Sequence, residues 1–138
     1  MPRRDLYHDT VKNALVKDGW TITHDPFKLP VGIRDSFVDL GAQKLVAAEK
    51  GTRKIAIEIK SFLSSSLLQD LETALGQFTL YRAFLSRVEP DRTLYLALPE
   101  TTMEGIYADK IADVLFDAKL VEAVTFDPDE EVIVRWIP

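Results

Sequence analysis

The sequence contains no cysteine among its 138 residues. This absence excludes disulfide bonds, thiol catalysis and zinc–thiolate sites, and it leaves no redox evidence about the compartment. No apolar run approaches the roughly 18 residues of a membrane-spanning helix. The N-terminal stretch MPRRDLYHD also lacks the apolar core of a signal peptide. We therefore expect a cytoplasmic protein that has no membrane partner.

Acidic residues outnumber basic ones, 22 to 17, and the charge is unevenly placed. The net charge is −5, which speaks against a protein that coats nucleic acid nonspecifically. Residues 1–60 carry 11 Lys or Arg against 8 Asp or Glu, whereas residues 61–138 carry 6 against 14. The first part therefore permits a nucleic-acid site without implying one. With 46% hydrophobic and 28% charged residues, the chain reads as a single globular domain spanning residues 1–138.

The hydrophobic patterns predict helices and strands in mixed order. A helix capped by Asp5 runs to about Asp18, and WTITHD follows as a strand. SFVDL and KLVAAEK are two strands or one strand bent near Gly41, and KGT turns the chain into the strand RKIAIEIKSF. A capping box at Ser66 and Gln69 begins the longest helix. RTLYLAL, helical pieces over 101–119, and the strands VEAVTF and VIVRWI complete an α/β fold with a mixed sheet.

The strand RKIAIEIKSF carries the first candidate site. Alternation places Glu58 and Lys60 on one face, opposite three isoleucines. A weak surface ion pair is the ordinary explanation of such a pair. Asp39 in SFVDL favours a functional site over a surface pair, because Asp39 and Glu58 together offer oxygen ligands for Mg²⁺ or Mn²⁺. Lys60 can then orient a metal-bound water or stabilise charge that develops on a phosphate.

Other polar residues extend or compete with this constellation. Gln77 and Tyr81 lie four apart on one face of the long helix, where they can position a lysine, a water or a phosphate; core or surface roles are the alternative. Glu49, beside Lys50, is the alternative first carboxylate if it is not simply an exposed hairpin end. The first helix offers His8 and Asp9 as weaker candidates.

The chain resembles the PD-(D/E)XK nuclease superfamily over residues 5–98. The resemblance rests on Asp39, Glu58-x-Lys60 and Gln77-x-x-x-Tyr81. The resemblance implies a restriction-endonuclease-like αβββαβ core with a mixed sheet, to which this chain adds a C-terminal helix and β-hairpin. It also implies catalytic roles for Asp39, Glu58 and Lys60, with the two carboxylates holding the metal. One difference is that Val38, not proline, precedes Asp39.

Longer segments resemble the XisH family over nearly the whole chain: DLYHDTVKNALVKDGWTITHDPF, VDLGAQKLVAAEKGTRKIAIEIKSF, ALGQFTLYR and FDPDEEVIVRW. Members are cyanobacterial proteins named as controlling factors for excision of the fdxN element. The resemblance implies a role in site-specific DNA rearrangement, often with a companion called XisI.

Two functions follow as expectations. The first is a Mg²⁺-dependent DNA endonuclease or resolvase-like enzyme, acting as a homodimer because one subunit holds one site. The second is a non-catalytic accessory factor that binds DNA or a partner protein and works with XisI. The intact Asp, Glu and Lys favour the enzyme. The net negative charge favours the accessory factor, because phosphate contacts dominate DNA affinity.

Overall fold

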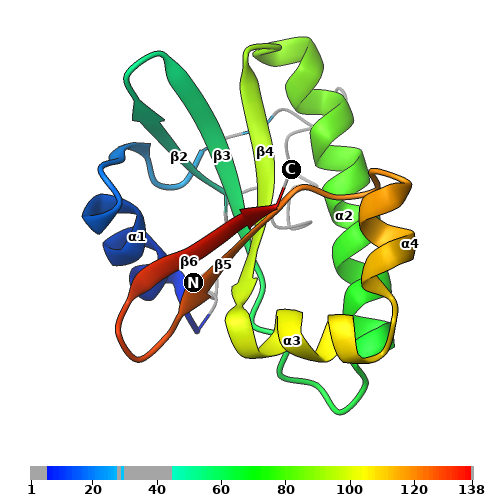
Figure 1. Ribbon diagram of the computed structural model, residues 1–138. Coiled ribbons are helices and arrows are strands. Elements are labelled where there is room, and N and C mark those ends of the chain that lie inside the picture. The colour runs from blue at the N-terminus through cyan, green and yellow to red at the C-terminus, as the bar shows by residue number, and fades with distance from the viewer. Residues whose placement is uncertain (1–5, 28, 30–44, 138) are drawn as a thin grey trace.

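The computed structural model describes residues 6–27, 29 and 45–137 (Figure 1). Over the described residues, the helices and strands follow the predicted order, and the helical stretch after residue 100 consists of two short helices. The predicted Asp5 cap and the strand predicted at SFVDL lie outside the described residues. The elements are α1 (His8–Lys17), β1 (Thr21–His24), β2 (Leu45–Lys50), β3 (Arg53–Ile59), α2 (Leu67–Val88), β4 (Arg92–Pro99), α3 (Glu100–Ala108), α4 (Ala112–Asp117), β5 (Ala123–Asp127) and β6 (Val132–Ile137).

The six strands form one mixed sheet in the order β1-β2-β3-β4-β5-β6. The pairs β3–β4 and β4–β5 are parallel, and the other three pairs are antiparallel. Parallel neighbours need long crossover connections, which α2 supplies for the first pair and α3 with α4 for the second. The predicted α/β class with a mixed sheet is confirmed.

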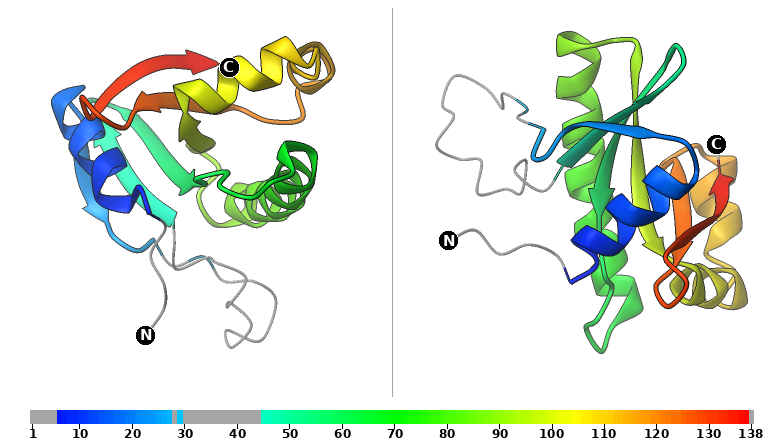
Figure 2. Two further views of the ribbon diagram at one scale, coloured as in Figure 1. Left: turned by 90° about the horizontal axis from the view of Figure 1, so that it is seen from below. Right: turned by 90° about the vertical axis from the view of Figure 1, so that its left-hand side faces the viewer.

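Helices cover both faces of this sheet (Figure 2). One hydrophobic core joins α2, α3 and α4 to the face that carries Ala56, and a second joins α1 to the face that carries Ile55 and Ile57. Every residue of β3 from Ile55 to Ile59 is consequently buried. Strands covered on both sides lose the distinction between a wet face and a dry face. The polar side chain of Glu58 is therefore inside the protein, not on a solvent-facing surface.

The sheet curves around α1, because this helix packs against both edge strands, β1 and β6. Asn13 Nδ2 donates to Glu131 Oε1 at 3.3 Å, and Lys17 Nζ donates to the Glu130 carbonyl at 2.9 Å. The rings of Trp20 and Trp136 lie 5.6 Å apart between their centroids. Both tryptophans pack in the core that α1 covers.

The long helix α2 begins at the predicted cap. Ser66 Oγ accepts a hydrogen bond from the Gln69 backbone N–H at 3.2 Å, which satisfies one of the free donors of the first turn. Its buried side chains recur at helical spacing and face the sheet: Leu71, Ala74, Phe78, Tyr81 and Leu85. Within the residues that the structure describes, no helix is long and apolar enough to cross a membrane.

Candidate active site

Glu58 and Lys60 lie at the carboxyl end of β3, beside the parallel strand β4. Glu58 pairs in register with Leu96, and the backbone N–H of Lys60 donates to the Ala97 carbonyl at 3.0 Å. The Glu58 carboxylate is 0% exposed, and its Oε1 lies 3.8 Å from Lys60 Nζ, whose side chain is 20% exposed. In open α/β sheets, ligands bind beyond the carboxyl ends of the strands. Glu58 and Lys60 therefore lie at the edge of the sheet where α/β proteins of this type bind their ligands.

Gln77 and Tyr81 belong to the helix that covers Glu58's face of the sheet. Tyr81 is fully buried in the same core as Ala56, which precedes Glu58 on that face of β3. Gln77 is partly exposed, but its Oε1 is buried and has no hydrogen-bond partner among the described residues. Because α2 runs back from the end of β3 (Figure 1), Gln77 lies one turn closer than Tyr81 to that end of the sheet.

Asp39, the predicted first carboxylate, lies outside the described residues. Among the residues that are described, no three His, Cys, Asp or Glu side chains form a group that can hold a metal ion. Glu58 by itself fits one ligand position for Mg²⁺, because it is a hard oxygen donor and Mg²⁺ typically takes one or two carboxylates. The assignment of Asp39 as the second carboxylate stays a prediction from the sequence.

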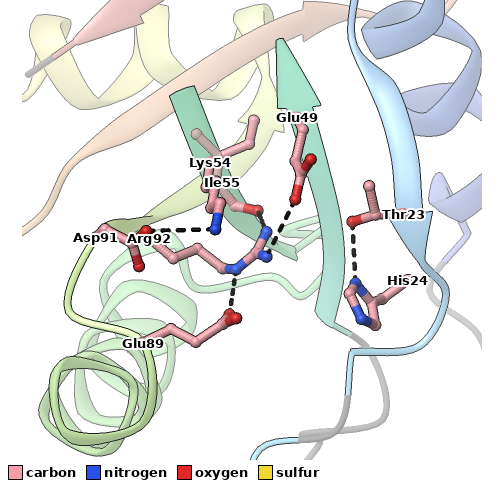
Figure 3. Close-up of polar contacts among 8 residues, drawn as sticks. All are labelled: Thr23, His24, Glu49, Lys54, Ile55, Glu89, Asp91 and Arg92. Atoms are coloured by element: carbon pink, nitrogen blue, oxygen red, sulfur yellow. Dashed lines mark hydrogen bonds and ion pairs between the residues drawn. The ribbon is translucent and has the colours of Figure 1, made fainter. Parts of the chain in front are cut away.

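Glu49, the alternative carboxylate, is at the wrong end of its strand. The β2–β3 register pairs Glu49 with Lys54 and places Leu45 opposite Glu58. Glu58 is four positions along the strand from Lys54, a distance of about 13 Å at 3.3 Å per residue. Glu49 Oε1 instead lies 3.8 Å from Arg92 Nη2 (Figure 3). The structure therefore removes Glu49 as a partner of Glu58.

His8 is buried and already has a partner on the α1 side of the sheet. Its Nε2 lies 2.8 Å from Asp25 Oδ1, and Lys12 Nζ donates to Asp25 Oδ2 at 2.6 Å. Burial raises the pKa of Asp25, but the hydrogen bonds from Lys12 and His8 and the positive charges of these two residues together outweigh it, so that this pKa falls below its usual value. Because α1 and Glu58 lie on opposite faces of the sheet, His8 is not part of the Glu58 site. Asp9, the other candidate on this helix, is exposed.

A hollow of about 210 Å³ opens beside Lys60, between the β3–α2 connection and the first turns of α2. Lys60 is the one lining residue that belongs to a sequence motif. The remaining lining residues carry no motif, because they meet only when α2 folds back on the strand. They are Ser61, Phe62, Leu63, Asp70, Thr73 and Ala74.

The chain is similar over nearly its whole length to one family model and to two solved structures. The family model described as XisH protein matches residues 1–134. A crystal structure of an XisH family protein from Nostoc punctiforme PCC 73102 is 41% identical, covers 97% of this chain and 100% of its own, and has a TM-score of 0.84. A crystal structure of a fdxN element excision controlling factor protein from Anabaena variabilis is 43% identical, with 98% and 100% coverage and a TM-score of 0.83. No curated protein matches this chain.

Proposed function

The chain belongs to the XisH family, and from this premise we propose that it is a Mg²⁺- or Mn²⁺-dependent DNA endonuclease of the PD-(D/E)XK type. The family is linked by name to control of fdxN element excision. Excision of a DNA element requires phosphodiester bonds to be broken. An endonuclease activity would therefore explain why the family is linked to excision.

The observation that carries the proposal is the buried Glu58 carboxylate with the Lys60 ammonium 3.8 Å away, at the carboxyl end of β3. An isolated pair on a wet face would contribute almost nothing and need no explanation. Burying an acid completely costs several kcal/mol even when a cation is close. Proteins often retain such costly, charged groups at catalytic sites.

Each residue of the proposed site has a separate task. Glu58 and Asp39 would hold the metal, which when bound polarises the phosphate and lowers the pKa of water. Lys60, partly open to solvent, places a positive charge where the phosphate develops negative charge during cleavage. Gln77 offers a buried carbonyl oxygen that can orient Lys60 or a water, and Tyr81 holds the helix against this face of the sheet.

The partners follow from the reaction. The substrate is DNA, and cutting both strands requires two sites, so the active form is a homodimer. A companion protein of the XisI type would direct this activity to the ends of the element. The restriction-endonuclease-like core is supported by the observed order of one helix, three strands, a second helix and a fourth strand.

The net charge of −5 favours a second function, a non-catalytic accessory factor that binds DNA or a protein. Counterion release from phosphates drives most DNA affinity, and an acidic protein gains little of it. In this alternative, Glu58 and Lys60 form a buried structural pair.

Nicking of supercoiled plasmid and of a four-way junction, in Mg²⁺ and in Mn²⁺, separates the two functions. The wild type would be compared with Glu58→Gln and Lys60→Met, purified identically. Lys54→Met is the matched control, because Lys54 lies on the same strand and its one ion pair among the described residues is with the exposed Asp91, at 3.3 Å. We expect metal-dependent nicking that both site variants lose and the control keeps. Equal nicking by all four proteins would indicate a contaminating nuclease. An inert wild type, alone and with the companion, would establish the accessory factor.

A further inference from the structure

The hollow beside Lys60 has walls that are tied together by hydrogen bonds. The Ser64 backbone N–H donates to Asp70 Oδ2 at 3.1 Å, and Ser64 Oγ donates to the Ser66 carbonyl at 3.2 Å. Phe62 adopts a φ of 55°, a left-handed conformation that is unfavourable for an aromatic residue. Such conformations persist where the surrounding structure enforces them, and they cluster at ligand sites. The β3–α2 connection is therefore held in one shape against the first turn of α2.

The lining combines one cation, one carboxylate and an apolar wall. Lys60 stands at the side nearest Glu58, since its Nζ is 3.8 Å from that carboxylate. Asp70 uses Oδ2 to accept from Ser64, and its Oδ1 has no hydrogen-bond partner in the described part of the chain. Phe62 is half-buried, and Leu63 is 66% exposed. A volume of about 210 Å³ is smaller than the roughly 300–1,000 Å³ of pockets for drug-sized ligands. It has room for one base, so the sugar and phosphate of a bound nucleotide would lie at its mouth, beside Lys60.

We propose that this hollow binds the DNA nucleotide next to the phosphate that is cut, an inference that rests on the proposed endonuclease function. Lys60 contacts the phosphate of this nucleotide, and the base lies against the ring of Phe62. Stacking on an aromatic side chain is a common way to hold an unpaired base. Asp70 Oδ1 accepts a hydrogen bond from the exocyclic amino group of the base.

This chemistry gives the hollow a base preference. A carboxylate only accepts hydrogen bonds. Cytosine and adenine present an exocyclic amino donor, whereas thymine presents a carbonyl acceptor at the corresponding position. The hollow should therefore bind cytosine or adenine nucleotides more tightly than thymine nucleotides. A good bidentate pair discriminates between bases by about 5- to 150-fold, and the single hydrogen bond to Asp70 should lie near the low end, at about tenfold.

The test is an NMR titration of the ¹⁵N-labelled protein with dCMP and with dTMP, without a divalent metal. Two variants on α2 form a matched pair. Thr73→Phe fills the hollow from its exposed rim, and Thr79→Phe makes the same change at an exposed position of the same helix that does not line it. We expect dCMP to shift the amide signals of Ser61 to Leu63 at millimolar concentrations and dTMP to bind about tenfold more weakly. Thr73→Phe should weaken dCMP binding at least about tenfold, and Thr79→Phe should leave it within about twofold.

Because no metal is present, this result is independent of cleavage. Two results would overturn the nucleotide site and leave the endonuclease intact, if the wild type nicks DNA through Glu58. In the first, dCMP causes no shifts at Ser61–Leu63; in the second, the Thr73→Phe variant binds dCMP as the wild type does. Binding at the hollow by a protein that does not nick DNA, alone or with the companion, supports a nucleotide site but refutes the endonuclease and, with it, the position next to a cut phosphate. Equal affinity for dCMP and dTMP refutes the role assigned to Asp70.

Discussion

Arg92 joins four separate parts of the chain, and its replacement should be costly. Its Nη1 donates to the Ile55 carbonyl at 2.9 Å and its Nε to Glu89 Oε2 at 2.5 Å, while Glu49 lies 3.8 Å from Nη2 (Figure 3). The guanidinium also stacks over Phe27 at 5.1 Å. The Arg92 side chain is only 2% exposed, so no water replaces these contacts when the charge is removed.

The magnitude follows from these contacts. In Arg92→Met, the lost charged hydrogen bond to a buried carbonyl costs about 1.5–3 kcal/mol. Each lost ion pair adds only about 0–1 kcal/mol, because the two glutamates are 31% and 39% exposed and remain hydrated. The lost cation–π contact adds about 0.5–1 kcal/mol. We expect a total near 3 kcal/mol, or a fall in Tm of about 10 °C for a domain of this size.

Chemical denaturation followed by circular dichroism measures this loss, with Arg82→Met as the control. Arg82 stacks over Phe78 at 5.1 Å but makes no hydrogen bond or ion pair within the described residues. Its replacement should cost less than about 1 kcal/mol. Arg92→Lys should recover little stability, because an ammonium does not reproduce the planar fork of donors. If Arg92→Met and Arg82→Met are equally stable, the assignment of Arg92 as a structural anchor is wrong.

Two further predictions concern local hydrogen bonds. The pKa of Asp25 in the folded protein lies below 3.8, because Lys12 and His8 outweigh the effect of burial. The Asp25 carboxylate therefore stabilises the fold at pH values above its pKa in the unfolded chain. That stability is lost as the pH falls from about 4 through the folded pKa, so acid titrations should show Asp25→Asn less stable at pH 7 and less sensitive to pH below 4. An unchanged acid profile in Asp25→Asn would contradict this. Ser66→Ala should lower the free energy of unfolding by about 1 kcal/mol through loss of the Gln69 cap, and urea denaturation that shows no change would count against the cap.

The order of elements could be predicted from the sequence because each element carries its own local signal. The capping box at Ser66, the period of the buried side chains on α2 and the hairpin turn before β3 all act within a few residues. The turn even fixes the β2–β3 register. Counting outward from Lys50 and Arg53 pairs Glu49 with Lys54, so the sequence alone contained the reason to reject Glu49 as a partner of Glu58.

Burial and long-range partners could not be predicted in the same way. Alternation in β3 suggests one polar face, but α2 covers that face and encloses Glu58. Asp25 carries no motif, and its contact with His8 depends on α1 packing beside the end of β1. Trp20 and Trp136 meet only because the sheet curves around α1 and brings its two edges to one helix.

Paramagnetic broadening by Mn²⁺ tests most directly whether the carboxyl end of β3 is a metal site. In the wild type, substoichiometric Mn²⁺ should broaden the amide signals of Ile57–Lys60 before those of Arg53 and Lys54 at the other end of the strand. Glu58→Gln should abolish this selective broadening while the protein stays folded. Broadening that is unaffected by Glu58→Gln, or that appears first at the exposed acidic turn around Asp129 and Glu130, would contradict a metal-dependent site built on Glu58.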